Sequence, residues 1–386
     1  MKILIVRCYP TYMSVSKSTY NIQEVGLAKA FTRAGHKCDI ILWTEKEEET
    51  VEIPVDKRKI IVYYKKGLSI LNNVIFLNQK QLLAQYDIIH VNEYNQIQAW
   101  YYAQTMPRKT VIYHGSYYSP FNKRFNMMCR VFDSLFLRSY LKKGTHFLVK
   151  SHLAKKFLCD KGIKPENIKV VGVGIDVDAL TNVTEACTSA LYHSISNDIS
   201  RLKMLYIGRI EPRRNVLFLL EVFARVLKRK PDARLYMIGT GEAKYMGEVK
   251  KKIRTLRLEQ NLCWEERIEQ RFLSDIYKAA DVFLLTTEYE IFGMVLLEAM
   301  YYHCVVMTTH NGGAGVLIQD GENGFVLDMD NANRWAERIS EISKDTDRMQ
   351  MIKDAAHKTI ADHFTWDHLA GVFVAEYRKV MGEEAP

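Results

Sequence analysis

The sequence predicts an α/β protein with two Rossmann-like domains, each built on a parallel sheet. Short apolar segments alternate with segments of helical periodicity along most of the 386 residues. This alternation is typical of parallel sheets that are covered by helices. It stops between about residues 179 and 200, where Thr, Ser and Asn replace large apolar side chains, and restarts at Lys203. The chain length also suits two domains of ordinary size.

The first domain is expected to span residues 1–180. Its strands are predicted near 2–7, 37–43, 59–64, 87–91, 109–113, 146–149 and 168–173. A helix with apolar residues at Ile22, Val25, Ala28 and Phe31 fills the first gap, and Gly35 stops it.

The second domain is expected over residues 201–365, after a linker at 181–200. Its strands are predicted near 203–208, 234–239, 262–264, 281–285, 304–308 and 324–327. Helices run from about Asn331 onward, with a break near residues 363–365.

The composition favours a folded protein of a reducing compartment. Apolar residues make up 48% of the chain, which is enough for two cores. Seven cysteines lie without CxxC pairs, so we expect reduced thiols in a cytoplasmic protein and no zinc site. The first residues, Met1–Val6, hold only four consecutive apolar side chains and predict a strand rather than a signal peptide. No apolar run approaches the roughly 18 residues that cross a bilayer.

Positive charge is concentrated in the first half. Residues 1–180 hold 27 basic against 15 acidic side chains, whereas the remainder is slightly acidic. Such a surface can attract nucleic acid, an anionic membrane or an anionic substrate. The chain has no zinc-finger spacing and no aromatic ribonucleoprotein motif, so nucleic acid is not an expected partner. The densest basic stretch, 123–143, also carries aromatic residues, and predicts either an amphipathic helix on anionic lipid or a core-packing helix with a solvated face.

The segment 286–300 is the most informative for function. A buried strand at 281–285 precedes it, and Phe292–Gly293 opens a helix. A helix N-terminus presents N–H groups and a positive dipole end, which suit an anion such as a diphosphate. Glu290 and Glu298, one before the helix and one about two turns into it, could each hold a sugar hydroxyl. The alternative is that both glutamates are simply solvated.

Three arginines occupy the loop between the strand that ends at Gly208 and the helix that follows Asn215. Arginine suits phosphate because its guanidinium offers a rigid fork of donors. We expect Arg209 and Arg214, which flank the turn, to contact a diphosphate, and Arg213 to be solvated.

Together these motifs resemble those of the family-4 retaining glycosyltransferases, which have the GT-B fold. The matching segments are Val111–Gly115, Val170–Asp176, Gly208–Arg209 with Arg214, the Glu-x7-Glu segment 290–298, Asn311–Gly313 and Asp320–Phe325. The resemblance covers nearly the whole chain. The sequence departs from the family at Arg214, Asn215 and Val316, where Lys, Gly and Glu are usual, and in the loop 9–18, which lacks glycine.

The resemblance implies a metal-independent enzyme that moves a hexose from a UDP-linked donor, with no other cofactor. Arg209, Arg214 and the N–H groups near Phe292, Gly293 and Met294 would stabilise the departing diphosphate.

The family also implies roles for individual side chains. Glu290 would hold the sugar, Glu298 the ribose, and His114 would lie near the donor sugar and phosphate. Gly208 and Gly241 would lie near the nucleotide, with the base against Arg267 and Ile268. The Asp-x-Asp sequences at 176–178 and 328–330 lack a phosphate-facing context, so no metal is assigned. Residues 366–386 are expected to pack back on the first domain.

The acceptor is expected to be a glycan or a lipid-linked molecule that enters from the basic first domain. That reaction would belong to surface polysaccharide or glycoconjugate synthesis, at the inner face of the membrane. Three alternatives stay open: a non-catalytic subunit of a glycosyltransferase complex, a GT-B epimerase that acts on the nucleotide sugar alone, and a nucleic-acid binder.

Overall fold

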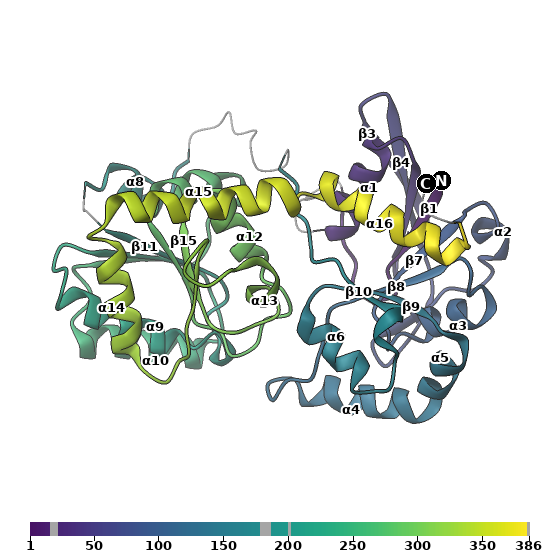
Figure 1. Ribbon diagram of the computed structural model, residues 1–386, viewed down its shortest axis with the longest axis horizontal. Coiled ribbons are helices and arrows are strands. Elements are labelled where there is room, and N and C mark those ends of the chain that lie inside the picture. The colour runs from purple at the N-terminus through teal and green to yellow at the C-terminus, as the bar shows by residue number, and fades with distance from the viewer. Residues whose placement is uncertain (16–21, 178–186, 200–201, 384–386) are drawn as a thin grey trace. The chain divides into compact units, whose positions relative to one another are not determined.

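A computed structural model describes residues 1–15, 22–177, 187–199 and 202–383 (Figure 1). Part of the expected linker and part of the loop 9–18 therefore lie outside the described residues. The chain forms two compact units. Unit 1 contains Met1–Asp176 with Thr365–Pro386, and unit 2 contains Val177–Phe364.

Unit 1 is built on an eight-stranded sheet. In spatial order its strands are β10 (Ile168–Val170), β9 (His146–Val149), β8 (Thr110–His114), β7 (Ile88–Asn92), β1 (Lys2–Val6), β2 (Lys37–Trp43), β4 (Arg58–Lys65) and β3 (Glu49–Val55). All neighbours are parallel except β3 and β4. The predicted parallel α/β fold is thus confirmed. Ile3, Leu4, Ile5 and Val6 are completely buried, as expected for a central strand that is covered on both faces.

Helices cover both faces of this sheet. They are α1 (Gln23–Arg33), α2 (Lys80–Leu83), α3 (Ile97–Thr105), α4 (Lys123–Phe132), the π-helix η1 (Asp133–Leu137), α5 (Arg138–Lys143), α6 (His152–Cys159), the 3-10 helix η2 (Pro165–Asn167) and α16 (Trp366–Met381). A short hairpin, β5 (Leu68–Ile70) and β6 (Asn73–Ile75), lies outside the main sheet.

The C-terminal helix α16 packs on α1 within unit 1 (Figure 1). Its Phe373 ring lies 6.3 Å from that of Phe31, and its Tyr377 hydroxyl lies 2.6 Å from Nδ1 of His90. A Cβ at Gly26 would come within 2.5 Å of the Trp366 ring, so this glycine makes room for the indole.

Unit 2 is built on a six-stranded parallel sheet. In spatial order its strands are β13 (Leu262–Glu265), β12 (Arg234–Ile238), β11 (Lys203–Ile207), β14 (Val282–Leu285), β15 (Val305–Thr308) and β16 (Phe325–Val326). From β11 the chain proceeds to β12 and β13 on one side, and then to β14, β15 and β16 on the other. The carboxyl ends of β11 and β14 therefore form the switch point where open α/β sheets bind ligands.

The helices of unit 2 begin before its first strand. They are α8 (Ala190–Asn197), the 3-10 helix η3 (Pro212–Arg214), α9 (Val216–Leu227), α10 (Ala243–Leu256), the 3-10 helix η4 (Gln270–Phe272), α11 (Leu273–Ala279), α12 (Met294–Tyr301), α13 (Ala314–Leu317), α14 (Ala332–Ile342) and α15 (Thr346–His363).

Helix α8 lies inside the segment where the sequence suggested a linker. Ser189 caps it by accepting a hydrogen bond from the Tyr192 backbone N–H, and Leu191 and Ile195 are buried. The Ser189 hydroxyl also donates to Glu265 at 2.7 Å. This part of the segment is therefore folded onto unit 2, although its polar composition resembles that of a linker.

Within the described part of the chain, no helix combines the length and the apolar character that a bilayer crossing requires.

Candidate functional site

Two loops meet at the switch point of unit 2. One follows β11 and contains η3, and the other follows β14 and leads into α12. The Thr286 hydroxyl donates to the backbone oxygen of Arg214 at 3.1 Å, and the Glu288 N–H donates to that of Arg213 at 2.8 Å. These bonds hold the arginine loop against the glutamate loop.

A continuous charged network joins the side chains of the two loops. The guanidinium of Arg214 forms an ion pair with Glu290. Arg213 lies 3.7 Å from the same carboxylate through Nη1 and 2.6 Å from Glu211 through Nη2. Arg209 approaches the other Glu211 oxygen at 3.6 Å. The structure thus brings Arg209, Arg214 and Glu290 into one cluster, as the proposed donor site requires.

The arginines of this network differ in exposure. The Arg214 and Glu290 side chains are only 11% and 13% exposed, whereas Arg209 is 70% exposed. Arg214 is therefore fixed by its partner, and Arg209 extends into solvent, where it can approach an incoming ligand.

The expectation that Arg213 is solvated is wrong. Its side chain is 25% exposed, and its Nη1 donates to the backbone oxygen of Tyr289 at 2.8 Å. Together with its ion pair to Glu290, this bond ties the two loops together. No feature of the sequence indicates this, because three arginines within six positions cannot be told apart before their contacts are known.

Asn215 explains one of the departures from the family. It adopts a left-handed conformation, with φ 44° and ψ 50°, and caps α9 by accepting a hydrogen bond from the Phe218 N–H. Asparagine tolerates this conformation better than most residues do. It can therefore stand where a glycine is usual.

The turn before α12 depends on close backbone packing. Gly293, with φ 84°, is the N-cap residue of this helix. The Gly312 N–H donates to the backbone oxygen of Glu290 at 3.0 Å. A Cβ at Gly313 would lie 1.6 Å from the backbone oxygen of Phe292. The Gly312–Gly313 pair therefore allows its loop to support the turn that presents the α12 N-terminus, where Met294 begins the helix.

Glu298 lies on α12 and is 4% exposed. One of its carboxylate oxygens accepts a hydrogen bond of 2.8 Å from the Tyr277 hydroxyl of α11. The sequence predicted the glutamate but not this phenol, which fixes its orientation.

The glycines of the β12 loop also serve close packing. A Cβ at Gly241 would lie 1.7 Å from the backbone oxygen of Ile210, and the Ile210 N–H donates to Thr240 at 2.9 Å. A Cβ at Gly239 would lie 1.8 Å from the backbone oxygen of Gly208. Gly208 and Gly241 therefore belong to loops that touch each other beside Arg209.

Arg267 and Ile268 lie farther along the same sheet. They follow β13, the edge strand that is separated from β11 by β12. Arg267 is exposed and Ile268 is half-buried.

His114 belongs to unit 1, at the end of β8, and is completely buried. Its Nδ1 lies 2.6 Å from one carboxylate oxygen of Glu93, and the other oxygen accepts a hydrogen bond of 3.2 Å from the Gly115 N–H. Burial raises the pKa of Glu93, but the nearby His114 and its hydrogen bond outweigh burial and lower that pKa to about 2. Glu93 is therefore ionised and favours the proton on Nδ1 of His114.

The other ring nitrogen of His114, Nε2, is buried and has no hydrogen-bond partner among the described residues. Sequence reasoning missed Glu93, although it directly follows β7, the strand that pairs with β8. His90, in β7, is 1% exposed, and its Nδ1 lies 2.6 Å from the Tyr377 hydroxyl, consistent with a structural role.

The Asp-x-Asp sequences at 176–178 and 328–330 are only partly described by the structure. Asp176 pairs with Lys29 at 3.1 Å, and Asp178 lies outside the described residues. In the described ranges, no three His, Cys, Asp or Glu side chains gather in a way that could hold a metal ion.

Two family models match successive parts of the chain. The model described as Glycosyltransferase Family 4 matches residues 25–179, and the model described as Glycosyl transferases group 1 matches residues 195–359. The second match includes the arginine loop, the Glu290–Glu298 segment and the Gly312–Gly313 pair.

Among curated proteins, the chain is similar to the D-inositol 3-phosphate glycosyltransferase of Corynebacterium urealyticum. The two are 27% identical over 236 residues, which cover 57% of this chain and 53% of that protein. The chain thus spans about half the length of the curated relatives it matches.

Among solved structures, the chain is similar to Anabaena HepE in complex with UDP. The TM-score is 0.73 at 18% identity, covering 98% of this chain and all of that one. Sucrose-phosphate synthase from Thermosynechococcus elongatus gives a TM-score of 0.74 at 16% identity, covering 99% of this chain and all of the other. At these identities the likeness establishes the GT-B fold alone.

Proposed function

Because the chain belongs to glycosyltransferase family 4, we propose that it transfers a hexosyl unit from a UDP-sugar to a glycan or lipid-linked acceptor. The observation that carries this proposal is the network of Arg209, Glu211, Arg213, Arg214 and Glu290 beside the N-terminus of α12. The choice of UDP rests on HepE, whose crystals hold UDP and UDP-glucose.

In this proposal the diphosphate lies between the arginine loop and the α12 N-terminus. Arg214 is held by Glu290 and contributes a fixed charge, while Arg209 closes on the phosphate from solvent. The N–H groups of Gly293 and Met294 add the dipole of the helix end. Glu290, oriented by Arg214, holds the hydroxyls of the sugar, and Glu298, oriented by Tyr277, holds the ribose.

The reaction breaks the bond between the anomeric carbon and the diphosphate oxygen, which keeps the bonding electron pair. The acceptor oxygen forms the new bond on the same face, so the configuration is retained, and its proton passes to the departing phosphate. Cations already aimed at the leaving oxygen lower the barrier by several kcal/mol without reorganising. These arginines supply that charge, so we propose a transfer that requires no metal.

His114 acts on the sugar in this scheme. With its Nδ1 proton held by Glu93, the buried Nε2 can accept a hydrogen bond from a donor hydroxyl.

The acceptor side is assigned to unit 1. Segment 123–143 forms α4, η1 and α5, and carries basic residues next to exposed Met127, Val131, Leu135 and Leu141. We propose that this segment brings the protein to an anionic membrane surface, where lipid-linked acceptors are found.

A thermal-shift panel of UDP-, GDP- and ADP-hexoses tests the donor assignment. A ligand that binds only the folded chain raises its stability by mass action, by about 2.7 kcal/mol at 100 times Kd. We expect the largest rise in melting temperature with a UDP-hexose, and no rise when the same ligand is added to Arg214→Ala. In a separate turnover assay, EDTA should leave the rate of UDP release unchanged. The absence of any shift with all three donor classes would contradict the proposal.

A further inference from the structure

A cavity of about 780 Å³ lies in unit 1 between the segment 75–84 and one face of α3. We call it the α3 cavity. Ile97, Tyr101 and Thr105 line one side of it, and their spacing of four residues places them on a single face of the helix. The volume falls within the range of sites that hold small molecules.

One end of the α3 cavity lies at the amino ends of two sheet strands. Ala84, shortly before β7, and Lys109, directly before β8, both line it. Open parallel sheets bind their usual ligands at the opposite, carboxyl ends of the strands, which is where β8 ends at His114. This end of the cavity is therefore remote from the side chain of unit 1 that is proposed to hold the sugar.

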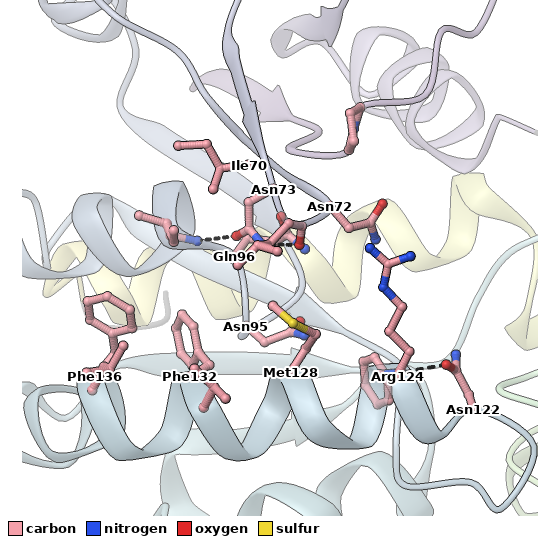
Figure 2. A pocket seen from close by; sticks show the side chains of 16 residues that line it. Ile70, Asn72, Asn73, Asn95, Gln96, Asn122, Arg124, Met128, Phe132 and Phe136 are labelled. Atoms are coloured by element: carbon pink, nitrogen blue, oxygen red, sulfur yellow. Dashed lines mark hydrogen bonds between the residues drawn. The ribbon is translucent and has the colours of Figure 1, made fainter.

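A smaller cavity of about 430 Å³, shown in Figure 2, is its neighbour. Met128, Phe132 and Phe136 lie along the helical wall of this smaller cavity in the figure. Ile97 lines both cavities, and the Phe136 ring lies 4.6 Å from the ring of Trp100, which lines the α3 cavity. Ile97 and these two rings therefore separate the two spaces.

The inner wall of the α3 cavity is apolar and already in place. Phe76, Leu83 and Tyr102 line it and are at most 5% exposed. The Phe76 N–H donates to Oε1 of Gln98 at 3.0 Å, which ties the segment 75–84 to α3. A ligand therefore meets a preformed surface.

Several polar atoms of the walls are bonded within the protein. Nε1 of Trp100 donates to Oγ of Ser139 at 2.6 Å, and the Thr105 hydroxyl donates to the backbone oxygen of Tyr101 at 2.8 Å. These groups need no partner from a ligand. The cavity therefore suits an apolar chain better than a hydroxylated molecule.

Two large side chains that line the α3 cavity remain exposed. Leu77 is 56% exposed and Tyr101 is 51% exposed. The turn after Leu77 passes through Asn78, whose left-handed φ of 56° asparagine tolerates well. Exposed apolar side chains beside a cavity are typical of a binding surface. An apolar chain lying in the cavity would cover both.

The charges that line the α3 cavity are positive. Lys80 and Lys109 line it, and among the described lining residues there is no Asp or Glu. Lys109 is half-buried, and its Nζ donates to the backbone oxygen of Tyr86 at 2.9 Å. An ammonium group has three donors, so Lys109 is held by one bond and can still bind an anion.

We propose that the α3 cavity binds an anionic amphiphile, a molecule with one apolar chain and a carboxylate or phosphate head. The chain lies along α3 and covers Leu77 and Tyr101, and the head meets Lys109. A free fatty acid and a phospholipid of an anionic bilayer both offer this chemistry. The site is additional to the proposed donor and acceptor sites, and the inference does not depend on the transfer reaction.

Calorimetric titration of the full chain with decyl phosphate, below its micellar concentration, tests the proposal. Butyl phosphate keeps the head and loses most of the chain, whereas decyltrimethylammonium keeps the chain and reverses the charge. We expect saturable binding of decyl phosphate and at least tenfold weaker binding of both comparison compounds. Equal affinity for decyl phosphate and either of them would overturn the proposal, because the chain or the head would then contribute nothing.

Two exposed leucines provide a matched pair of variants. Leu77 lines the α3 cavity, whereas Leu68 in β5 is 54% exposed and lines neither cavity. Leu77→Ser should weaken decyl phosphate at least tenfold, and Leu68→Ser should leave its affinity unchanged. Both side chains are exposed, so both variants should fold. Equal losses would mean that the amphiphile adsorbs to apolar surface in general, and would overturn the proposal.

Two further variants locate the head and exclude the neighbouring cavity. Lys109→Met keeps the apolar stem and removes the charge, so it should weaken decyl phosphate at least fivefold and leave decyltrimethylammonium unchanged. Met128→Ser alters the smaller cavity and should have no effect on decyl phosphate. A loss in Met128→Ser together with wild-type affinity in Leu77→Ser would place the amphiphile in the smaller cavity and overturn the proposal.

Vesicles of phosphatidylcholine and phosphatidylglycerol distinguish the two sources of the ligand. Weaker vesicle binding by Leu77→Ser than by Leu68→Ser would identify a phospholipid, and equal vesicle binding with the loss of decyl phosphate affinity would identify a free amphiphile. Either result supports the site. A wild-type chain that binds no decyl phosphate, and that forms a dimer in sedimentation velocity which Leu77→Ser weakens, would show that a second copy covers the cavity and would overturn the proposal.

UDP-hexose binding is measured in the same samples. Leu77→Ser should keep wild-type affinity for the donor. Wild-type protein that binds the donor but no decyl phosphate refutes this inference and leaves the proposed function standing, whereas the reverse result supports the α3 cavity and refutes the proposed donor.

Discussion

The Nδ1 atom of His114 lies 2.6 Å from a carboxylate oxygen of Glu93, and both side chains are buried in unit 1. Replacing the carboxylate in Glu93→Gln offers an amide donor to Nδ1 and moves the ring proton to Nε2. We expect the transfer rate to fall at least tenfold, or by about 1.4 kcal/mol, with UDP binding unchanged. Steady-state kinetics and calorimetry measure the two effects.

A second, partly buried pair provides the control. Glu376 lies 3.1 Å from Nε2 of His146, also within unit 1. Glu376→Gln should alter stability and leave turnover as it is. If both variants lose turnover to the same extent, the effect of Glu93 is structural and His114 has no part in transfer.

Arg209 and Arg214 should respond differently to removal. Arg209→Ala deletes an exposed side chain, so we expect at least a tenfold loss of kcat/KM with the free energy of unfolding within about 0.5 kcal/mol of wild type. Arg214→Ala also removes the nearer of the two guanidinium groups beside the partly buried Glu290, leaving only Arg213 at 3.7 Å, and should lower that free energy by about 1–3 kcal/mol. Urea denaturation and kinetics distinguish the two. Unchanged kinetics in both variants would remove the arginines from the proposed site.

Gly313→Ala should disturb the proposed donor site by steric conflict. The added methyl would lie 1.6 Å from the Phe292 backbone oxygen, so the turn before α12 must move. We expect a loss of about 1–3 kcal/mol of stability and a smaller thermal shift with UDP-hexose. Gly315→Ala is the control, because its methyl would meet nothing closer than a His310 carbon at 4.0 Å. If Gly313→Ala had the stability and the thermal shift of wild type, the close packing of Gly313 on the Phe292 backbone oxygen would be dispensable.

Acid should destabilise unit 1 through His90. Burial, with a smaller contribution from Lys150, lowers the pKa of His90 from 6.5 to about 3. Between these two pKa values, the His90 imidazole therefore binds a proton in the unfolded chain but stays neutral in the folded chain. This contribution to stability is complete above pH 6.5 and is lost as the pH falls toward 3.

His90 should change the free energy of unfolding by at most about 1.4 kcal/mol per pH unit. His90→Asn keeps a polar atom near Tyr377 but cannot titrate, so urea denaturation between pH 7.5 and 4.5 should show a shallower loss than in wild type. An identical slope in the variant would show that other groups account for the acid sensitivity.

The parallel strands could be predicted from sequence because each is a short, continuous apolar run. Strand β3 (Glu49–Val55) could not. It is an edge strand whose side chains are largely exposed and which contains Pro54, so its composition resembles that of a loop. Helix α8 was missed for a similar reason, since two buried apolar residues suffice to hold it on unit 2.

The proposed donor site was easier to predict from the sequence than the α3 cavity of unit 1. Arg209, Arg214 and Glu290 lie in two short loops that follow strands, and strand order brings such loops together. Leu77, Leu83 and Trp100 come from segments with no shared motif. Only the folded chain shows that they surround one space, and that the Gly312–Gly313 pair is required by carbonyl contacts.

Turnover of UDP-hexose by Glu290→Gln tests the central claim most directly, with Glu288→Gln, an exposed neighbour, as the control. The account predicts that Glu290→Gln still binds UDP but releases it from UDP-hexose at least 100-fold more slowly, a loss of about 2.7 kcal/mol, while Glu288→Gln stays close to wild type. Wild-type turnover by folded Glu290→Gln would contradict the account.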